Sequence, residues 1–188
     1  MKTARALWRE VQMGYEPQRL VFLDESGVNT KMTRTHGRAP KGQRLVASVP
    51  HGHWKTLTFI AALRHDRIDA PWVLDGPMDG EAFKTYLREE LAATLMTGDL
   101  VTMDNLPAHK VAGVREIIER TGAKLLYLPP YSPDLNPIEQ VFAKLKGLLR
   151  KAAERTIDGL WRTIGKLLDE FSSQECMNYL NNAGYQSI

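Results

Sequence analysis

The sequence has little cysteine, no long apolar run and no hydrophobic leader. One cysteine, Cys176, in 188 residues excludes an intramolecular disulfide and a cysteine-based zinc cluster, and it suits a reducing compartment. No run approaches the roughly 18 apolar residues that a membrane helix needs. The N-terminal residues lack the apolar core of a signal peptide. We therefore expect a soluble, cytoplasmic protein without a membrane partner.

Acidic residues are absent from residues 31–65. This stretch contains seven Lys and Arg residues and four His residues but no Asp or Glu. Charges of one sign repel one another unless a negative partner offsets the repulsion, so the stretch favours contact with a polyanion. A solvated loop and strand face is the alternative. The net charge of +3 permits a polyanionic partner without requiring one.

A chain of this length suffices for one domain with a sizeable core, which we place at residues 19–188. Residues 1–18 are expected to form an N-terminal arm, linker or short helix. Hydrophobic periodicity and turn residues predict strands over 19–24, 44–49, 56–63, 70–74, 99–104 and 124–128, and helices over 79–95, 112–120, 137–153, 157–171 and 173–179. This order of elements indicates an α/β fold, a mixed sheet with helices on its faces.

Three carboxylates have informative positions. Asp24 and Asp104 each end a short apolar run of the β type, where open sheets place their ligands, and the two strand ends are expected side by side. Glu139 follows Pro137, a residue tolerated in the first turn of a helix. Three hard oxygen ligands suit Mg²⁺ or Mn²⁺, and such a site indicates phosphoryl transfer. Glu25 should point away from Asp24, because side chains alternate along a strand.

The segments around these acids are unusual in sequence. They read LDESG over residues 23–27, TMDNLPAHK over 102–110 and LPPYSPDLNPIE over 128–139. Together they closely resemble the DDE catalytic domain of bacterial insertion-sequence transposases of the IS630 type, relatives of the Tc1/mariner group. The resemblance runs from about residue 19 to residue 185, and the proline-rich segment before Glu139 is its most specific part.

This resemblance implies a ribonuclease-H-like fold, a mixed sheet flanked by helices on both faces. It also implies that Asp24, Asp104 and Glu139 jointly hold two divalent ions, Mg²⁺ or Mn²⁺. A dication relieves the repulsion between crowded carboxylates while it binds the phosphate to be cut. The implied reaction is hydrolysis of DNA at the transposon ends, followed by attack of the 3′-hydroxyl on target DNA.

Basic residues near these segments are candidates for DNA contacts. The six candidates are Arg38, Lys41, His109, Lys110, Lys144 and Lys146. His109 is placed near the start of a helix, where phosphate contacts are common, but a structural histidine is an equal alternative. Asn136 and Tyr131 are expected to shape the turn that presents Glu139.

Transposases of this group resemble two-part proteins with helix-turn-helix modules ahead of the catalytic domain. Residues 1–18 are too short for one, so we expect an isolated catalytic domain, a frameshift product or a truncated relic. A homodimer and a separate upstream helix-turn-helix segment are further expected partners, at the nucleoid of a bacterial cell. Two alternatives remain open at this point: a catalytically silent DNA-binding or assembly module, and another ribonuclease-H-like nuclease.

Overall fold

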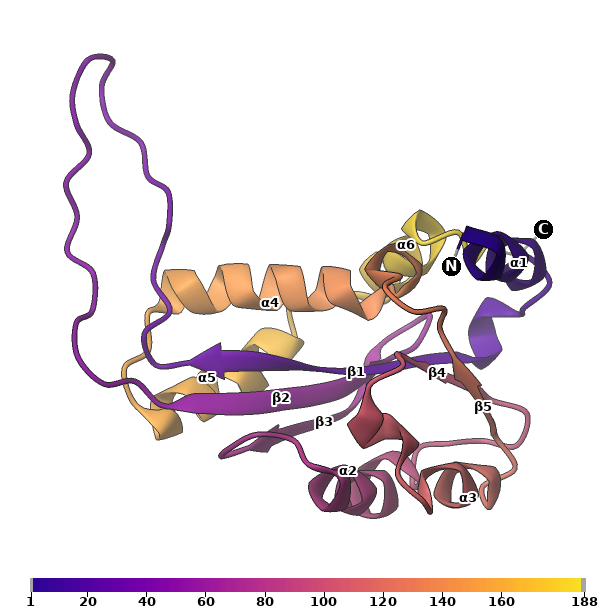
Figure 1. The fold of residues 1–188 in the computed structure, drawn as a ribbon. Coiled ribbons are helices and arrows are strands. Elements are labelled where there is room, and N and C mark those ends of the chain that lie inside the picture. The colour runs from indigo at the N-terminus through magenta and orange to yellow at the C-terminus, as the bar shows by residue number, and fades with distance from the viewer. Residues whose placement is uncertain (1, 187–188) are drawn as a thin grey trace.

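The computed structural model describes residues 2–186 and is built around a five-stranded sheet of order β3-β2-β1-β4-β5 (Figure 1). The central strand, β1 (Leu20–Asn29), pairs antiparallel with β2 (Thr56–Leu63) and parallel with β4 (Leu100–Met103). On the outside, β2 pairs antiparallel with β3 (Ile68–Leu74), and β4 pairs parallel with β5 (Lys124–Tyr127). The two strands that precede the predicted acids are therefore neighbours, as the sequence analysis expected.

Helices cover both faces of this sheet. One face packs against α4 (Ile138–Ala152), α5 (Ile157–Leu168) and α6 (Ser173–Asn182); the other packs against α2 (Gly80–Tyr86), its continuation Leu87–Leu91, and α3 (Val114–Glu119). The prediction of a mixed α/β sheet flanked on both faces is confirmed. Within residues 2–186, even the longest helix, α4 with 15 residues, falls short of what crossing a membrane requires.

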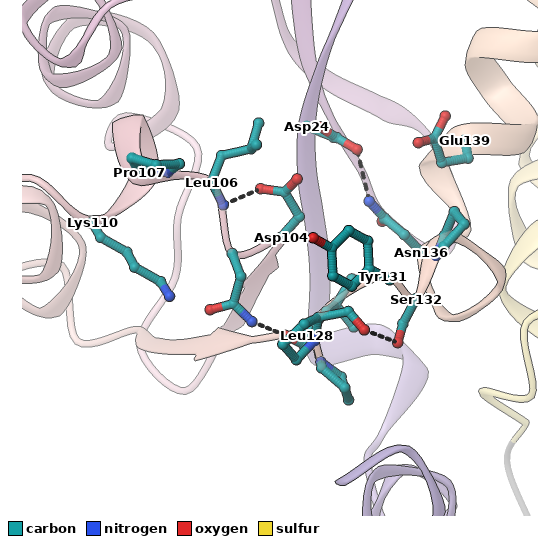
Figure 2. A pocket seen from close by; sticks show the side chains of 14 residues that line it. Asp24, Asp104, Leu106, Pro107, Lys110, Leu128, Tyr131, Ser132, Asn136 and Glu139 are labelled. Carbon is teal, nitrogen blue, oxygen red and sulfur yellow. Dashed lines mark hydrogen bonds between the residues drawn. The ribbon is translucent and has the colours of Figure 1, made fainter. Parts of the chain in front are cut away.

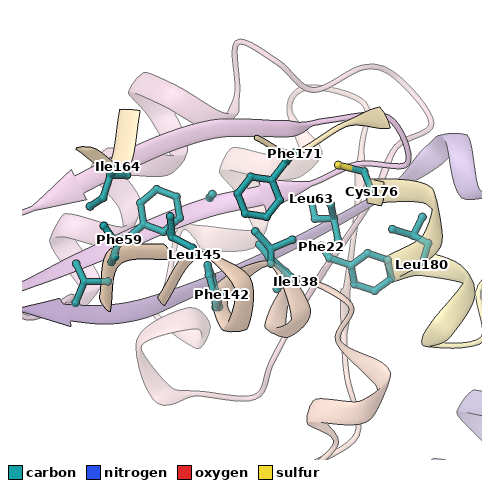
Figure 3. Packing of buried hydrophobic residues seen from close by; sticks show 14 of the residues in the cluster. Phe22, Phe59, Leu63, Ile138, Phe142, Leu145, Ile164, Phe171, Cys176 and Leu180 are labelled. Carbon is teal, nitrogen blue, oxygen red and sulfur yellow. The ribbon is translucent and has the colours of Figure 1, made fainter. Parts of the chain in front are cut away.

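Alternation along β1 sends its side chains to two different cores. Phe22 lies in the cluster with α4, α5 and α6 (Figure 3), whereas Val21 and Leu23 lie in the cluster with α2 and α3. Each of these side chains is fully buried, and burial of one such side chain contributes about 1.5–3 kcal/mol. The same alternation directs the next two residues, Asp24 and Glu25, to opposite faces, as predicted.

The short helix expected near the N-terminus is α1 (Lys2–Gln12), and it packs beside the end of α6 (Figure 1). Gln12 donates hydrogen bonds to two carbonyl oxygens just past α6, at 3.1 and 3.2 Å. The indole of Trp8 donates to the hydroxyl of the buried Tyr185 at 2.9 Å. These contacts tie the first helix to the last residues of the fold; a domain boundary at residue 18 remains a prediction.

Between β1 and β2 the chain forms an extended excursion, residues 30–55, which we call the basic arm (Figure 1). The strand predicted over residues 44–49 is wrong, because this segment is irregular and pairs with no strand of the sheet. Val46 and Val49, whose apolar character suggested a strand, are 84% and 65% exposed. The basic arm therefore presents its charges to solvent along most of its length.

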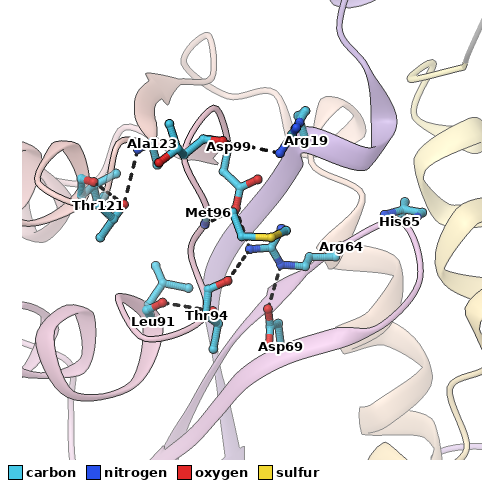
Figure 4. Close-up of polar contacts among 12 residues, drawn as sticks. Arg19, Arg64, His65, Asp69, Leu91, Thr94, Met96, Asp99, Thr121 and Ala123 are labelled. Atoms are coloured by element: carbon cyan, nitrogen blue, oxygen red, sulfur yellow. Dashed lines mark hydrogen bonds and ion pairs between the residues drawn. The ribbon is translucent and has the colours of Figure 1, made fainter.

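A buried arginine fixes the end of the sheet from which β4 starts (Figure 4). Arg64, 1% exposed, forms ion pairs with Asp69 and Asp99, each at 2.7 Å, and donates to the carbonyl oxygen of Thr94. Removing one partner of a buried pair leaves a charge without compensation and typically costs about 3–5 kcal/mol. This cluster thus joins the turn after β2 to the segment that leads into β4.

Candidate active site

Asp24 lies inside β1, not at its end. The strand continues to Asn29, and Gly27 pairs with Thr58 of β2, although a Ser-Gly pair such as Ser26-Gly27 is common in turns. Asp24 itself stands two residues past the last residue of β1 that pairs with β4. The predicted strand end was wrong because the backbone hydrogen bonds of β2 outweigh the turn preference of a Ser-Gly pair. Asp24 nevertheless lies where β1 no longer pairs with β4, and it lines the same cavity as Asp104.

The carboxylate of Asp24 is buried, at 6% exposure, and both its oxygens accept hydrogen bonds. The backbone amide of Glu25 donates to Oδ1, and the side-chain amide of Asn136 donates to Oδ2, each at 2.8 Å. Burial, together with the negative charges of Glu25, Asp104 and Glu139, raises the pKa of Asp24 to about 8. The three predicted acids therefore share one electrostatic environment.

Asp104 follows β4 directly and is held by one hydrogen bond and one ion pair. Its Oδ1 accepts from the backbone amide of Leu106 at 3.0 Å and lies 2.7 Å from Nδ1 of His109. The other ring nitrogen of His109 lies 2.8 Å from the carboxylate of Glu25, and the ring packs on Phe83 at 4.5 Å between centroids. His109 thus links Asp104 to Glu25, whose side chain lies on the face of the sheet opposite to that of Asp24.

His109 is fully buried, which agrees with the alternative of a structural histidine, and its contact with DNA remains a prediction. Burial alone would lower its pKa, but the close contacts with the carboxylates of Asp104 and Glu25 together raise the pKa of His109 to about 9. Burial likewise opposes ionisation of Asp104, whereas the contacts with His109 and the Leu106 amide hold its pKa below the ordinary value. The charged imidazolium of His109 therefore helps to orient the carboxylate of Asp104.

Glu139 lies in the first turn of α4, where it is exposed, and is presented by the segment Leu128–Pro137, which we call the proline-rich loop. This loop is anchored at several points. Its first residue donates its backbone amide to Met103 at 2.9 Å, and Tyr185 donates its hydroxyl to the carbonyl oxygen of Leu135 at 2.8 Å. These contacts, together with the bond from Asn136 to Asp24, fix the start of α4 against β1 and β4.

The helix α1 anchors the same loop from outside. The guanidinium of Arg5 contacts both carboxylate oxygens of Asp134, at 2.9 and 2.7 Å, and the hydroxyl of Ser132 at 2.9 Å. Arg9 adds a second ion pair with Asp134 at 3.0 Å. Hydrogen bonds from Arg5 hold the pKa of Asp134 below its usual range. The N-terminal helix therefore contributes to the placement of Glu139.

The three acids line one cavity of about 530 Å³ (Figure 2). The side chains around them in this cavity include Asn105, Leu106, Lys110, Tyr131 and Asn136. Within residues 2–186, no three Asp, Glu, His or Cys side chains lie close enough to hold a metal ion in their present positions. Asp24 and Asp104 face Asn136, His109 and backbone amides instead. The acids share a cavity without converging on one point.

The donor set of this cavity fits a hard divalent cation. All three acids offer oxygen, and among the described residues neither Asp24 nor Glu139 forms an ion pair with a Lys, Arg or His. The Oδ1 atom of Asn136 is buried without a hydrogen-bond partner beside Asp24. Burial, and to a smaller extent the neighbouring carboxylates, raise the pKa of Asp24, and a bound dication would stabilise the charged form of this carboxyl against both effects.

The remaining basic residues predicted to contact DNA differ in whether their side chains are exposed or already have partners within the protein. Lys110 is exposed and lines the cavity, with its ammonium 5.3 Å from the ring centroid of Tyr127. Lys144 already has partners within the protein, because it lies 2.6 Å from Glu175 and donates to the carbonyl oxygen of Glu170; its contact with DNA remains a prediction. Arg38 and Lys41 lie on the exposed basic arm and Lys146 is half-buried on α4; as DNA contacts they remain predictions.

The sequence did not predict two contacts that position the acids. Asn136 was expected only to shape the turn, and its bond to Asp24 spans residues that are far apart in the chain. Glu25 was expected to face away from Asp24, which is confirmed, but its link through His109 to Asp104 was not anticipated. The five-residue interval between Asp104 and His109 was the available signal, since the 3-10 turn Pro107–Lys110 folds it back.

Comparisons with known proteins agree with this site. The family described as "DDE superfamily endonuclease" matches residues 19–160. The chain is 25% identical to the Tc1 transposase of Caenorhabditis elegans over 211 aligned residues, which cover 98% of this chain and 76% of that protein. It is also similar to the solved Mos1 strand transfer complex, with a TM-score of 0.77, 15% identity and coverage of 97% of this chain and 57% of that one.

The separate catalytic domain of the Mos1 mariner transposase gives a TM-score of 0.70 at 14% identity, covering 97% of this chain and 85% of that one. At such identities the likeness establishes the fold, and the predicted ribonuclease-H-like architecture is confirmed. The chain spans 57% of the length of the Mos1 chain in its strand transfer complex. By the match over residues 19–160, which hold Asp24, Asp104 and Glu139, this chain belongs to the DDE superfamily of endonucleases.

Proposed function

We propose that this chain is the catalytic domain of a Tc1/mariner-type transposase that cuts DNA at transposon ends and joins the 3′-hydroxyl ends to target DNA. The observation that carries the proposal is the gathering of Asp24, Asp104 and Glu139 on one cavity, with the pKa of Asp24 raised to about 8. Mos1 assemblies solved with Mg and with Mn, and one described as a strand transfer complex, support it by analogy.

The three acids would hold Mg²⁺ or Mn²⁺, as two ions. When bound, such ions activate a water or hydroxyl for attack on phosphorus and stabilise the leaving oxygen. Binding requires the carboxylates to turn from their present partners, because Asp24 and Asp104 now face protein donors. The buried Oδ1 atom of Asn136 offers one more oxygen close to Asp24.

The other residues of the site act on the acids. His109 holds Asp104 through Nδ1 and is itself held by Glu25, so the orientation of Asp104 depends on both faces of the sheet. Asn136 keeps Asp24 near the start of α4. Because the pKa of Asp24 is about 8, ion binding near neutral pH displaces a proton from this carboxyl, and affinity for the ion rises with pH.

DNA is the proposed partner. Lys110 would contact a phosphate at the cavity, and Arg38, Lys41 and Lys146 would contact the backbone farther from the cut. Recognition of the transposon ends by a separate helix-turn-helix segment, and action as a homodimer, belong to the same proposal. The acid-free composition of the basic arm supports contact with a polyanion.

A cleavage assay tests this function. Purified protein is incubated with labelled duplex DNA and with an RNA–DNA hybrid, in Mn²⁺ or in EDTA. We expect Mn²⁺-dependent nicking of DNA that Asp104→Asn abolishes, whereas Asp158→Asn, an exposed control on α5, cuts like the wild type. Preference for the hybrid would favour another ribonuclease-H-like nuclease, and the absence of any cleavage would favour a silent DNA-binding module.

A further inference from the structure

Tyr131 presents its ring at the cavity of the three acids (Figure 2). At 88% exposure it is the most exposed large hydrophobic side chain among residues 2–186. The residue that follows it, Ser132, is only 5% exposed, so the ring projects from a segment that is itself packed against the protein. A tyrosine that only shaped the turn, as the sequence analysis expected, would need no such exposure.

The backbone of Tyr131 is also strained. Its φ of +53° lies in the left-handed region, which glycine adopts freely and which costs other residues about 1–2 kcal/mol. The other non-glycine residues with positive φ within residues 2–186 are two alanines. Arg5 donates to the carbonyl oxygen of Tyr131 at 3.3 Å and to Ser132, which stabilises this conformation. A large aromatic side chain is therefore kept where glycine would be easier, as occurs at functional sites.

The cavity around the ring offers three kinds of chemistry. The carboxylates suit cations, and the ammonium of Lys110 suits a phosphate. Leu106, 43% exposed, adds a second apolar side chain to the same cavity. A nucleotide combines a phosphate with a flat apolar base, so one nucleotide would satisfy the cation, the ammonium and the ring together.

From these observations we propose that Tyr131 is a base-stacking residue, which binds the nucleobase next to the phosphate at the acids when that base is unpaired. Stacking on an aromatic side chain tolerates any base, because every base has a π-face. The proposal rests on the proposed function, since it takes DNA as the ligand. It gives the exposed ring a role in holding one strand at the cut.

Oligonucleotides with and without bases test this. A single-stranded oligonucleotide of thymidines is compared with an equally long one of abasic residues, because both carry the same phosphate charge. Binding is measured by fluorescence anisotropy in EDTA, which prevents cleavage. In the wild type we expect the thymidine strand to bind about 5- to 150-fold more tightly, the equivalent of about 1–3 kcal/mol for one stacked base.

The variants decide which side chain causes this ratio. Tyr131→Ala is expected to bring the ratio close to one, whereas Tyr131→Phe, which keeps the ring, retains it. Trp161→Ala, which removes an aromatic side chain 47% exposed on α5, is the matched control and should behave as the wild type. A wild-type ratio near one, or a Tyr131→Ala variant that keeps the full ratio, would overturn the proposal.

The outcome is separable from that of the proposed function. If the wild type cut no DNA in Mn²⁺ and the Tyr131→Ala substitution removed the base preference, the enzyme would be contradicted and the stacking site supported. A wild type that cuts DNA while Tyr131→Ala retains full base preference would support the enzyme and contradict the stacking site.

Discussion

The proline-rich loop and the basic arm are both irregular segments, yet they are held in opposite ways. In the loop, Ser132, Leu135 and Asn136 are buried, and contacts reach it from α1, from β1 and from the C-terminal residues. In the arm, nearly every side chain is exposed. Hydrogen bonds join the arm to itself mainly at its base, where the amide of Thr30 donates to Lys55 at 3.1 Å.

The difference corresponds to what each segment has to do. The loop places Glu139 and Asn136 relative to Asp24, and catalytic groups lose much of their effect when displaced by about 1 Å. The arm contributes positive charge, and attraction to phosphates acts over about 10 Å at ordinary salt concentrations without fixed geometry. Buried contacts therefore fix the segment that positions the acids, whereas the basic residues of the arm lie in solvent.

The largest effect is expected from the acid that the loop presents. Glu139→Gln should reduce cleavage by at least about a thousandfold, because an uncharged amide binds a divalent cation far more weakly than a carboxylate does. Thermal unfolding without metal should be unchanged, since Glu139 is exposed. Glu116→Gln, at an exposed position of α3, is the control. Near-normal cleavage by Glu139→Gln would remove this residue from the site.

The pH dependence of stability tests the environment that the loop creates around Asp24. Its pKa is about 8 in the folded state and near 3.8 otherwise, so the folded state retains a proton that the unfolded state releases. Without metal, the contribution of Asp24 to the free energy of unfolding should therefore be largest below about pH 4 and fall as the pH rises towards 8. The change amounts to a few kcal/mol, at about 1.4 kcal/mol for each pH unit.

Urea unfolding in EDTA at a series of pH values measures this. Asp24→Asn should flatten the fall, most clearly between about pH 4 and 6.5. The pKa of His109, raised from 6.5 to about 9, adds its own fall only above that range. An Asp24→Asn variant with the full pH dependence of the wild type would show that this carboxyl is not the group concerned.

Two matched double variants separate the loop from the arm. The first double variant combines Arg5→Gln with Arg9→Gln, and the second combines Arg38→Gln with Lys41→Gln. Each removes two positive charges. The first should reduce the cleavage rate at saturating DNA roughly tenfold, because the loop loses its anchors on Asp134. The second should leave that rate unchanged, weaken DNA binding, and lower its salt dependence by roughly two in slope.

Cleavage rates and binding at several salt concentrations distinguish the two outcomes. If the first variant changed the salt slope as much as the second, α1 would be a DNA-binding surface and not an anchor of the loop. If the second variant left the slope unchanged, the basic arm would return to the alternative of a solvated face.

A smaller effect is expected inside the fold. Tyr185→Phe removes the hydroxyl that donates to Leu135 at 2.8 Å and accepts from Trp8 at 2.9 Å. Because both partners would be left partly unsatisfied, the free energy of unfolding should fall by about 1–2 kcal/mol. Denaturant unfolding measures this, with Tyr131→Phe as the exposed control. A loss no larger than that of the control would mean that the proline-rich loop is not anchored through this hydroxyl.

Much of the fold and of the site follows from local sequence. The apolar run before Asp104 forms a strand because it is buried on both faces of the sheet, and helical periodicity located α4 and the start of α2, whose N-cap is Asp79. Alternation placed Asp24 and Glu25 on opposite faces. These are properties of neighbouring residues, which a single sequence expresses directly.

The features that the sequence patterns did not reveal depend on partners that are distant in the chain. Nothing local to residues 44–49 shows that no strand is available to pair with them. Lys144 resembles a phosphate-binding lysine until α6 places Glu175 beside it. The burial of His109 follows from Glu25 and Phe83, which belong to other elements. Such contacts depend on how the elements pack, and sequence patterns report on that only indirectly.

Binding of Mn²⁺, measured by isothermal titration calorimetry, tests the central claim most directly. The wild type should bind Mn²⁺ with release of protons near neutral pH, since the pKa of Asp24 is about 8. Asp104→Asn should lose this heat, and Asp158→Asn should retain it. Equal binding by the wild type and by Asp104→Asn, or no binding by either, would contradict a metal site built from Asp24, Asp104 and Glu139.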